Sequence, residues 1–168
     1  MLTLFAMLVC GCGSSAATKK YLEELGPAKN HVADFEAERA RVMAPEIKAM
    51  PTMGRGKFNQ LPALEKSLQT AYEAFGKQQT YMMGHPAPEE LRGFYINYLK
   101  YLQEEEEYFK SVQSLCIQMH QFWDQNHPAD ELPSFTQTWL QNEQQMPKKA
   151  AQVAEQFKGV EEVYKRYK

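Results

Sequence analysis

The feature that most constrains the fold is a long row of apolar side chains between Pro88 and Asn126. Its members recur at alternating steps of three and four residues, so they share one side of an α-helix. The row is Leu91, Phe94, Tyr98, Tyr101, Glu105, Tyr108, Val112, Leu115, Met119 and Phe122. A second row beside it widens the stripe to the face of a helix in a globular bundle. Because prolines bracket the stretch, we predict one long helix over Pro88–Asn126.

Three other stretches carry the same helical spacing, and Pro/Gly-rich segments separate them. They are approximately Lys19–Met50, Leu61–Met83 and Leu132–Tyr167. Gly26-Pro27 is expected to kink or divide the first stretch, and Pro147 to bend the last or split it after Met146. Alternating β-branched runs are absent from the sequence, which argues against strands. We therefore predict an all-α fold, an antiparallel up-down four-helix bundle with a long third helix.

Two charged residues interrupt the apolar rows. Glu105 lies in the middle of the long row, and Arg39 interrupts the row of the first stretch. A carboxylate on an apolar face has to be paired, protonated or hydrated. The functional interpretation of Glu105 is a metal ligand or a specificity-giving polar site. The structural interpretation is a buried or half-buried pair with a basic residue, or a side chain that snorkels to solvent from a loosely packed level. Our hypothesis is that Arg39 and Glu105 meet across the bundle as a buried ion pair.

The amino terminus is an uncharged apolar run, Met1–Val9, followed by small residues. Such a run is typical of a secretory signal and is too short to span a bilayer. The segment Val9-Cys10-Gly11-Cys12 resembles the lipobox of bacterial lipoproteins. That resemblance implies cleavage before Cys12, diacylglyceryl attachment to its sulfur and acylation of the new amino terminus. The predicted organisation is then a signal peptide at 1–11, a tether at 12–18 and a helical bundle domain at 19–168.

The same resemblance sets an expected location and partner. Gly13 after the lipidated cysteine looks like a residue that permits sorting to the outer membrane of a Gram-negative cell. Two or three acyl chains hold a protein stably at a membrane, whereas one chain binds only marginally. We expect an anchored protein facing the periplasm, in contact with the membrane and with another envelope protein.

The net charge and the absence of known catalytic motifs argue against several classes of function. The net charge is −2 with both signs mixed along the chain, which argues against nucleic-acid binding. Neither the Glu-x-x-His pairs of di-iron bundles nor the motifs of zinc hydrolases and P-loops occur. Glu105 lies roughly 17 to 22 Å along the helix from Cys116 and His120, too far for a shared reacting centre. We predict a non-enzymatic protein without a cofactor.

Side chains that are soft metal ligands form two clusters in the sequence. Cys116, Met119 and His120 lie within about one turn, and Met82, Met83 and His85 lie near a turn. Sulfur and imidazole suit Cu(I), but an antiparallel arrangement puts these clusters at opposite ends. We therefore predict no metal site and expect Cys116 to be a buried small apolar residue.

Two functions remain open. The first is a lipoprotein that tethers, scaffolds or assists assembly by protein contact. Small helical lipoproteins of the pilotin kind resemble it in size and layout. The second is a periplasmic module that binds a metal ion or a small apolar ligand between its helices. This alternative predicts a cavity lined by Tyr72, Tyr98, Tyr101 and Tyr108, with Glu105 as its polar group.

Overall fold

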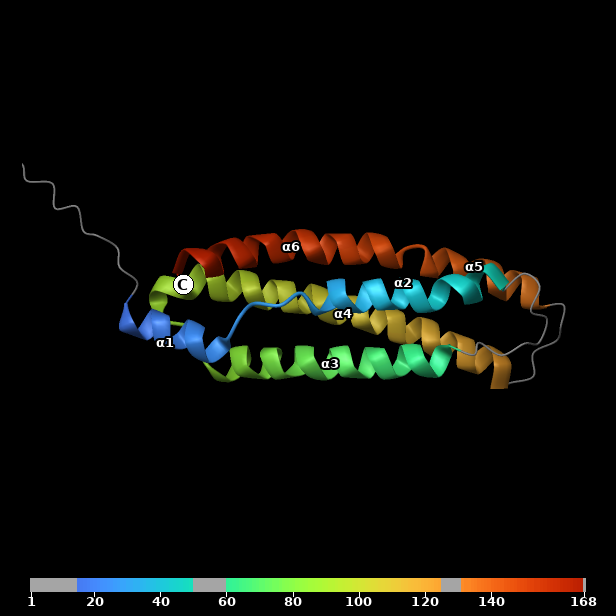
Figure 1. Ribbon diagram of the computed structural model, residues 1–168, viewed down its shortest axis with the longest axis horizontal. Coiled ribbons are helices and arrows are strands. Elements are labelled where there is room, and N and C mark those ends of the chain that lie inside the picture. Colours follow the sequence, from blue (N-terminus) through green and yellow to red (C-terminus); the bar gives the residue numbers. More distant parts are fainter. Residues whose placement is uncertain (1–14, 50–59, 125–130, 168) are drawn as a thin grey trace, which may run out of the picture.

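The computed structural model describes residues 15–49, 60–124 and 131–167, and the regular structure in these ranges is entirely helical. No strand occurs among the described residues, as the sequence predicted. Figure 1 shows the helices lying alongside one another. They are α1 (Ala16–Leu25), α2 (His31–Ala49), α3 (Leu61–Gly84), the 3-10 turn η2 (Glu89–Leu91), α4 (Arg92–Asp124), α5 (Leu132–Glu143) and α6 (Met146–Tyr167).

The first predicted stretch is divided into two helices. Ser15 caps α1, because its side-chain oxygen accepts a hydrogen bond from the Thr18 backbone N–H at 3.2 Å. The helix therefore begins at Ala16, inside the segment that we predicted to be a tether. It ends at Gly26, whose φ of 71° lies in the left-handed region that glycine adopts without strain.

The second helix begins after a further cap and continues through a proline. The Asn30 side chain accepts a hydrogen bond from the Ala33 backbone N–H at 2.9 Å. Pro45 lies inside α2, which nevertheless extends to Ala49. The helix therefore does not end at this proline.

Helices α3 and α4 match their predicted ranges closely. The turn between them contains Pro86 and Pro88, and η2 forms the first turn after it. Of the ten positions in the long apolar row, the nine from Leu91 to Met119 are buried. This agreement confirms that the three-four spacing identified the inward face of α4.

The last predicted stretch is also divided, slightly before the expected point. Helix α5 ends at Glu143 and α6 begins at Met146, so Pro147 falls in the first turn of α6. Proline is tolerated there because the first backbone N–H groups of a helix have no intrahelical partner. The residues Gln144 and Gln145 form the turn between the two helices.

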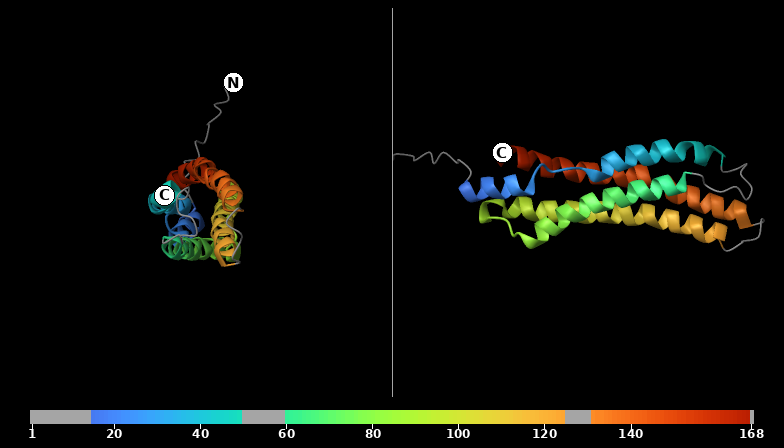
Figure 2. Two further views of the ribbon diagram at one scale, coloured as in Figure 1. Left: turned by 90° about the vertical axis from the view of Figure 1, so that its right-hand side faces the viewer. Right: turned by 60° about the horizontal axis from the view of Figure 1, so that its bottom comes forward.

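Helix α4 packs against several other helices. It contacts α3 and α6, and α2 also contacts α3 and α6. Viewed along the long axis, these helices stand around a common interior (Figure 2). Helix α1 packs on α3 and α6 at the end where α6 finishes (Figure 1). The result is an all-helical, bundle-like fold with one continuous hydrophobic core.

Several predictions concern residues outside the described ranges. The predicted signal peptide at 1–11, the predicted lipidation site Cys12 and Gly13 lie there, as do most of the Pro/Gly-rich segment before Leu61 and the proline that follows the long helix. The side chain of Phe122, the last member of the long row, also lies outside the description.

Candidate functional site

Arg39 is almost fully buried, with 2% of its surface exposed, and carboxylates meet it on two sides. Its Nε lies 2.6 Å from one oxygen of Glu36, and its Nη1 lies 2.5 Å from Glu143 Oε1. The Tyr108 hydroxyl donates to Glu36 in the same cluster. Burial alone would lower the pKa of Arg39, but the hydrogen bonds to Glu36 and Glu143 outweigh it and raise the pKa. The guanidinium therefore stays charged and joins α2 to the end of α5.

Glu105 is completely buried, and its partners lie at the start of α2. Its Oε1 accepts a hydrogen bond from the His31 backbone N–H at 3.0 Å. The ring Nδ1 of His31 lies 3.4 Å from Oε2, and the Tyr101 hydroxyl donates to Oε1. A carboxyl group at a helix amino terminus accepts from otherwise unpaired N–H groups and faces the positive end of the helix dipole. Glu105 of α4 thus caps α2 from a neighbouring helix.

The predicted Arg39–Glu105 pair is therefore wrong in this structure. Arg39 takes its ion pairs from Glu36 and Glu143, whereas Glu105 is satisfied by His31 and Tyr101. Glu143 lies on the inward side of the last predicted stretch, among apolar positions, so its residue type was a visible anomaly there. Periodicity identified the polar positions on each face but could not say which faces meet at the same level.

The cysteine and histidines of the two clusters of soft side chains are buried or contact other residues. Cys116 is buried, and burial raises its pKa to about 12. The His120 ring instead lies 2.8 Å from Glu65, and the His85 ring stacks on Tyr81. Within the described ranges, no three His, Cys, Asp or Glu side chains are grouped to hold a metal ion.

The tyrosines that we expected around a cavity pack against other aromatic rings. Tyr101 lies 5.8 Å from Tyr98 and 5.3 Å from Phe157, measured between ring centroids. Tyr108 likewise packs edge-on against Phe109. The buried hydroxyl of Tyr98 has no hydrogen-bond partner among the described residues. Tyr101 and Tyr108 are thus buried in contact with other aromatic side chains.

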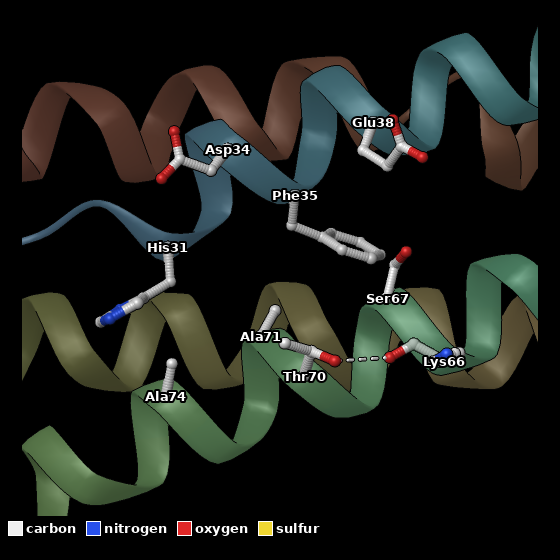
Figure 3. A pocket seen from close by; sticks show the side chains of 9 residues that line it. All are labelled: His31, Asp34, Phe35, Glu38, Lys66, Ser67, Thr70, Ala71 and Ala74. Carbon is white, nitrogen blue, oxygen red and sulfur yellow. Dashed lines mark hydrogen bonds between the residues drawn. The ribbon is translucent and has the colours of Figure 1, made fainter.

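A surface groove between α2 and α3 is a candidate site among the described residues. We call it the α2–α3 groove; its volume is about 400 Å³. Figure 3 shows Phe35 reaching from α2 towards α3, while Ala71 and Ala74 point from α3 towards α2. The residues that line it are His31, Asp34, Phe35, Glu38, Lys66, Ser67, Thr70, Ala71 and Ala74.

The groove combines an apolar floor with an acidic rim on the α2 side. Phe35 is 4% exposed and forms the floor with the alanine methyl groups. Glu38 is paired with Arg41 at 2.6 Å, and the hydrogen bond from Arg41 lowers the pKa of Glu38. Asp34 is exposed and takes part in none of the ion pairs formed by the described residues. An apolar floor beside an unpaired carboxylate can bind an amphipathic group that carries a positive charge.

Our sequence analysis missed this groove, although a signal for it was present. On α3 the positions 67, 70, 71 and 74 hold only Ser, Thr and Ala, at the spacing of one helix face. Small side chains on that face leave room beside Phe35 that larger residues would fill. The signal becomes visible only when α2 is known to lie opposite.

No family model, curated protein or solved structure matches this chain. Among the residues that the structure describes, no helix is both long and apolar enough to cross a membrane.

Proposed function

We propose that the protein is a lipoprotein of the bacterial cell envelope that acts by protein contact and has no catalytic role. The lipobox-like Val9–Cys12 segment supports an anchor on Cys12, and Gly13 supports an outer-membrane location facing the periplasm. The first described helix begins at Ala16, so the tether between lipid and domain is short. An anchor so close to α1 would keep the helices near the membrane surface.

We further propose that α2, α3, α4 and the α5–α6 pair are the four arms of an antiparallel up-down bundle, with α4 as the long third arm. The contacts of α2 and of α4 with both α3 and α6 support a closed ring of four neighbours. Helices joined by short connections run in opposite directions. In this arrangement α1 covers one end of the bundle.

The observation that carries the contact function is the α2–α3 groove. Its apolar floor and acidic rim lie on the outside of the helices, where another protein has access to them. Apolar surface framed by polar residues is a common feature of interaction sites. The alternative function, binding of a small apolar ligand, is favoured by the same volume of about 400 Å³, which falls in the usual range of ligand pockets.

Metabolic labelling with an alkyne fatty acid tests the anchor. We expect the full-length protein to incorporate the label, Cys12→Ser to lose it, and the matched Cys10→Ser control to retain it. Equal labelling of Cys12→Ser and the wild type would contradict lipidation at Cys12.

Affinity capture from detergent-solubilised membranes tests the contact function. If binding depends on the folded helices, Cys12→Ser protein should retain the same partners as the wild type. Loss of every partner together with the lipid would show that anchoring alone explains the association.

A further inference from the structure

We infer that the α2–α3 groove binds an amphipathic helix of a partner protein, with a basic edge of that helix beside Asp34. The inference rests on the proposed contact function and deepens it by naming the chemistry of the partner. It is carried by the shape of the groove, by the small residues of α3 and by the distribution of charge along α2.

The shape of the groove suits a helix. Its α2 side is formed by His31, Asp34, Phe35 and Glu38, and its α3 side by Ser67, Thr70, Ala71 and Ala74. Each set has the spacing i, i+3, i+4 and i+7, so each is a straight face of one helix. Seven residues of rise correspond to about 10 Å, or two turns, of a helix laid between them.

The small residues of α3 allow a close approach. Side chains of Ser and Ala let two helix backbones come nearer than Leu or Phe would. Figure 3 shows that Phe35 is the single large apolar side chain among the labelled residues of the groove. A partner helix would place its apolar side chains beside Phe35 and over Ala71 and Ala74, in the manner of helix-in-groove recognition.

The carboxylates of α2 determine which charge a bound helix should carry along its edge. Both oxygens of Glu38 already accept hydrogen bonds from Arg41, at 2.6 and 2.8 Å. Asp34, one turn before it, is exposed and has no such partner among the described residues. A Lys or Arg on the bound helix would supply the missing cation, whereas a Glu would meet a like charge at close range.

Lys66 on α3 makes the charge on the two sides of the groove different. Its exposed side chain lines the α3 side of the groove. A basic edge of the partner is therefore attracted to the α2 side and repelled from Lys66. This difference favours one placement of the bound helix over the opposite one.

Two labelled peptides of about 15 residues, long enough to form a helix, test the inference. Both carry Leu and Ala on one face, and they differ only in Lys or Glu along one edge. Fluorescence anisotropy with the full-length protein in detergent measures their affinities. We expect the Lys-edged peptide to bind about tenfold more tightly, the ratio that a difference of about 1.4 kcal/mol produces.

Matched substitutions locate the bound peptide. Thr70→Trp places a large ring in the groove and should weaken binding of the Lys-edged peptide more than tenfold. Thr80→Trp makes the same change at another exposed position of α3, outside the groove, and should leave it unchanged. Asp34→Asn should weaken binding about two- to fivefold, as for one exposed charge pair, whereas Glu162→Gln on α6 should have no effect.

Several outcomes would overturn the inference. Equal affinity of the two peptides removes the role of charge, and equal effects of Thr70→Trp and Thr80→Trp place binding elsewhere. Self-association of the protein that Thr70→Trp abolishes would assign the groove to a second copy of this chain. These results leave the labelling and capture experiments untouched, so failure of the groove is distinguishable from failure of the proposed function.

Discussion

The Arg39 and Glu105 sites are both buried interruptions of an apolar row, yet they are stabilised in different ways. Arg39 is surrounded by ionisable partners, the carboxyl groups of Glu36 and Glu143. Glu105 is held by a backbone N–H, a phenol hydroxyl and the His31 ring. One site uses opposite charge, and the other uses hydrogen bonds and the amino terminus of a helix.

The comparison also shows what the two sites share. Glu143 is the last residue of α5, and His31 is the first residue of α2. Helix ends present backbone groups and side chains that lack intrahelical partners, so they can satisfy a polar residue of a neighbouring helix. A polar interruption in an apolar row therefore indicates, in this protein, where a neighbouring helix begins or ends.

The largest expected effect is at the charged site. Arg39→Ala should destabilise the protein by about 3–5 kcal/mol, because it leaves Glu36 and Glu143 without their cation. Arg41→Ala is the matched control, since Arg41 also pairs with a glutamate three residues earlier but is exposed. Urea unfolding followed by circular dichroism measures both. Similar losses for the two variants would mean that burial does not distinguish them.

A smaller effect is expected at the site that uses hydrogen bonds. Glu105→Gln replaces one acceptor oxygen by an amide donor, so one buried donor loses its partner at a cost of about 2 kcal/mol. Glu107→Gln, an exposed position in the same run of four glutamates, is the control and should change stability little. If both variants unfold at the same urea concentration, Glu105 does not cap α2 as described.

Alkaline pH should weaken both sites. Burial, followed by the nearby Glu105, raises the pKa of Tyr101, and burial with a hydrogen bond to Glu36 raises the pKa of Tyr108. A tyrosine whose pKa is higher in the folded state favours the folded protein less as pH rises above its unfolded value near 10. Stability should fall between pH 10 and 11 by about 1 kcal/mol for each tyrosine.

Phenylalanine variants test whether these two tyrosines cause the loss of stability at alkaline pH. Tyr101→Phe and Tyr108→Phe should each make the decline with pH shallower, as measured by urea unfolding at a series of pH values. A decline that is unchanged in both variants would assign the effect to other groups.

The smallest effect is expected for the coupling between the two sites. His31, which contacts Glu105, lies eight residues before Arg39 on α2, or about 12 Å of helix rise. Sites that share no partner have additive effects, so a double-mutant cycle of Arg39→Ala and Glu105→Gln should give a coupling below about 0.5 kcal/mol. A coupling of several times that size would restore the direct pair that we first predicted.

Much of the secondary structure followed from the sequence. The row from Leu91 to Met119 is buried throughout, and the divisions near Gly26 and Pro147 occur within a few residues of the expected positions. The start of α1 was placed too late because the capping oxygen of Ser15 was not recognised. Periodicity, helix breaks and caps each depend on residues a few positions apart, so they can be recognised in a single sequence.

The candidate sites could be predicted from the sequence less well than the secondary structure. The sequence identified Arg39 and Glu105 as exceptional and Cys116 as a buried residue, and the structure places all three in the interior. It did not identify the partners of Arg39 and Glu105, or the groove beside Phe35. The contacts of Arg39 with Glu143 and of Glu105 with His31, and the groove between Phe35 and α3, join residues tens of positions apart along the chain. Glu36 and Tyr101, three and four residues away, were local partners that the sequence analysis did not recognise.

The sequence by itself determined that the chain is helical and which face of each helix turns inward, because the repeat of 3.6 residues is a local property. Only the tertiary structure decided which side chains meet, because the axial shift of one helix against another is set by packing along their whole length. That shift brings Glu105 to the first turn of α2, Arg39 to the last residue of α5, and Phe35 opposite the small face of α3.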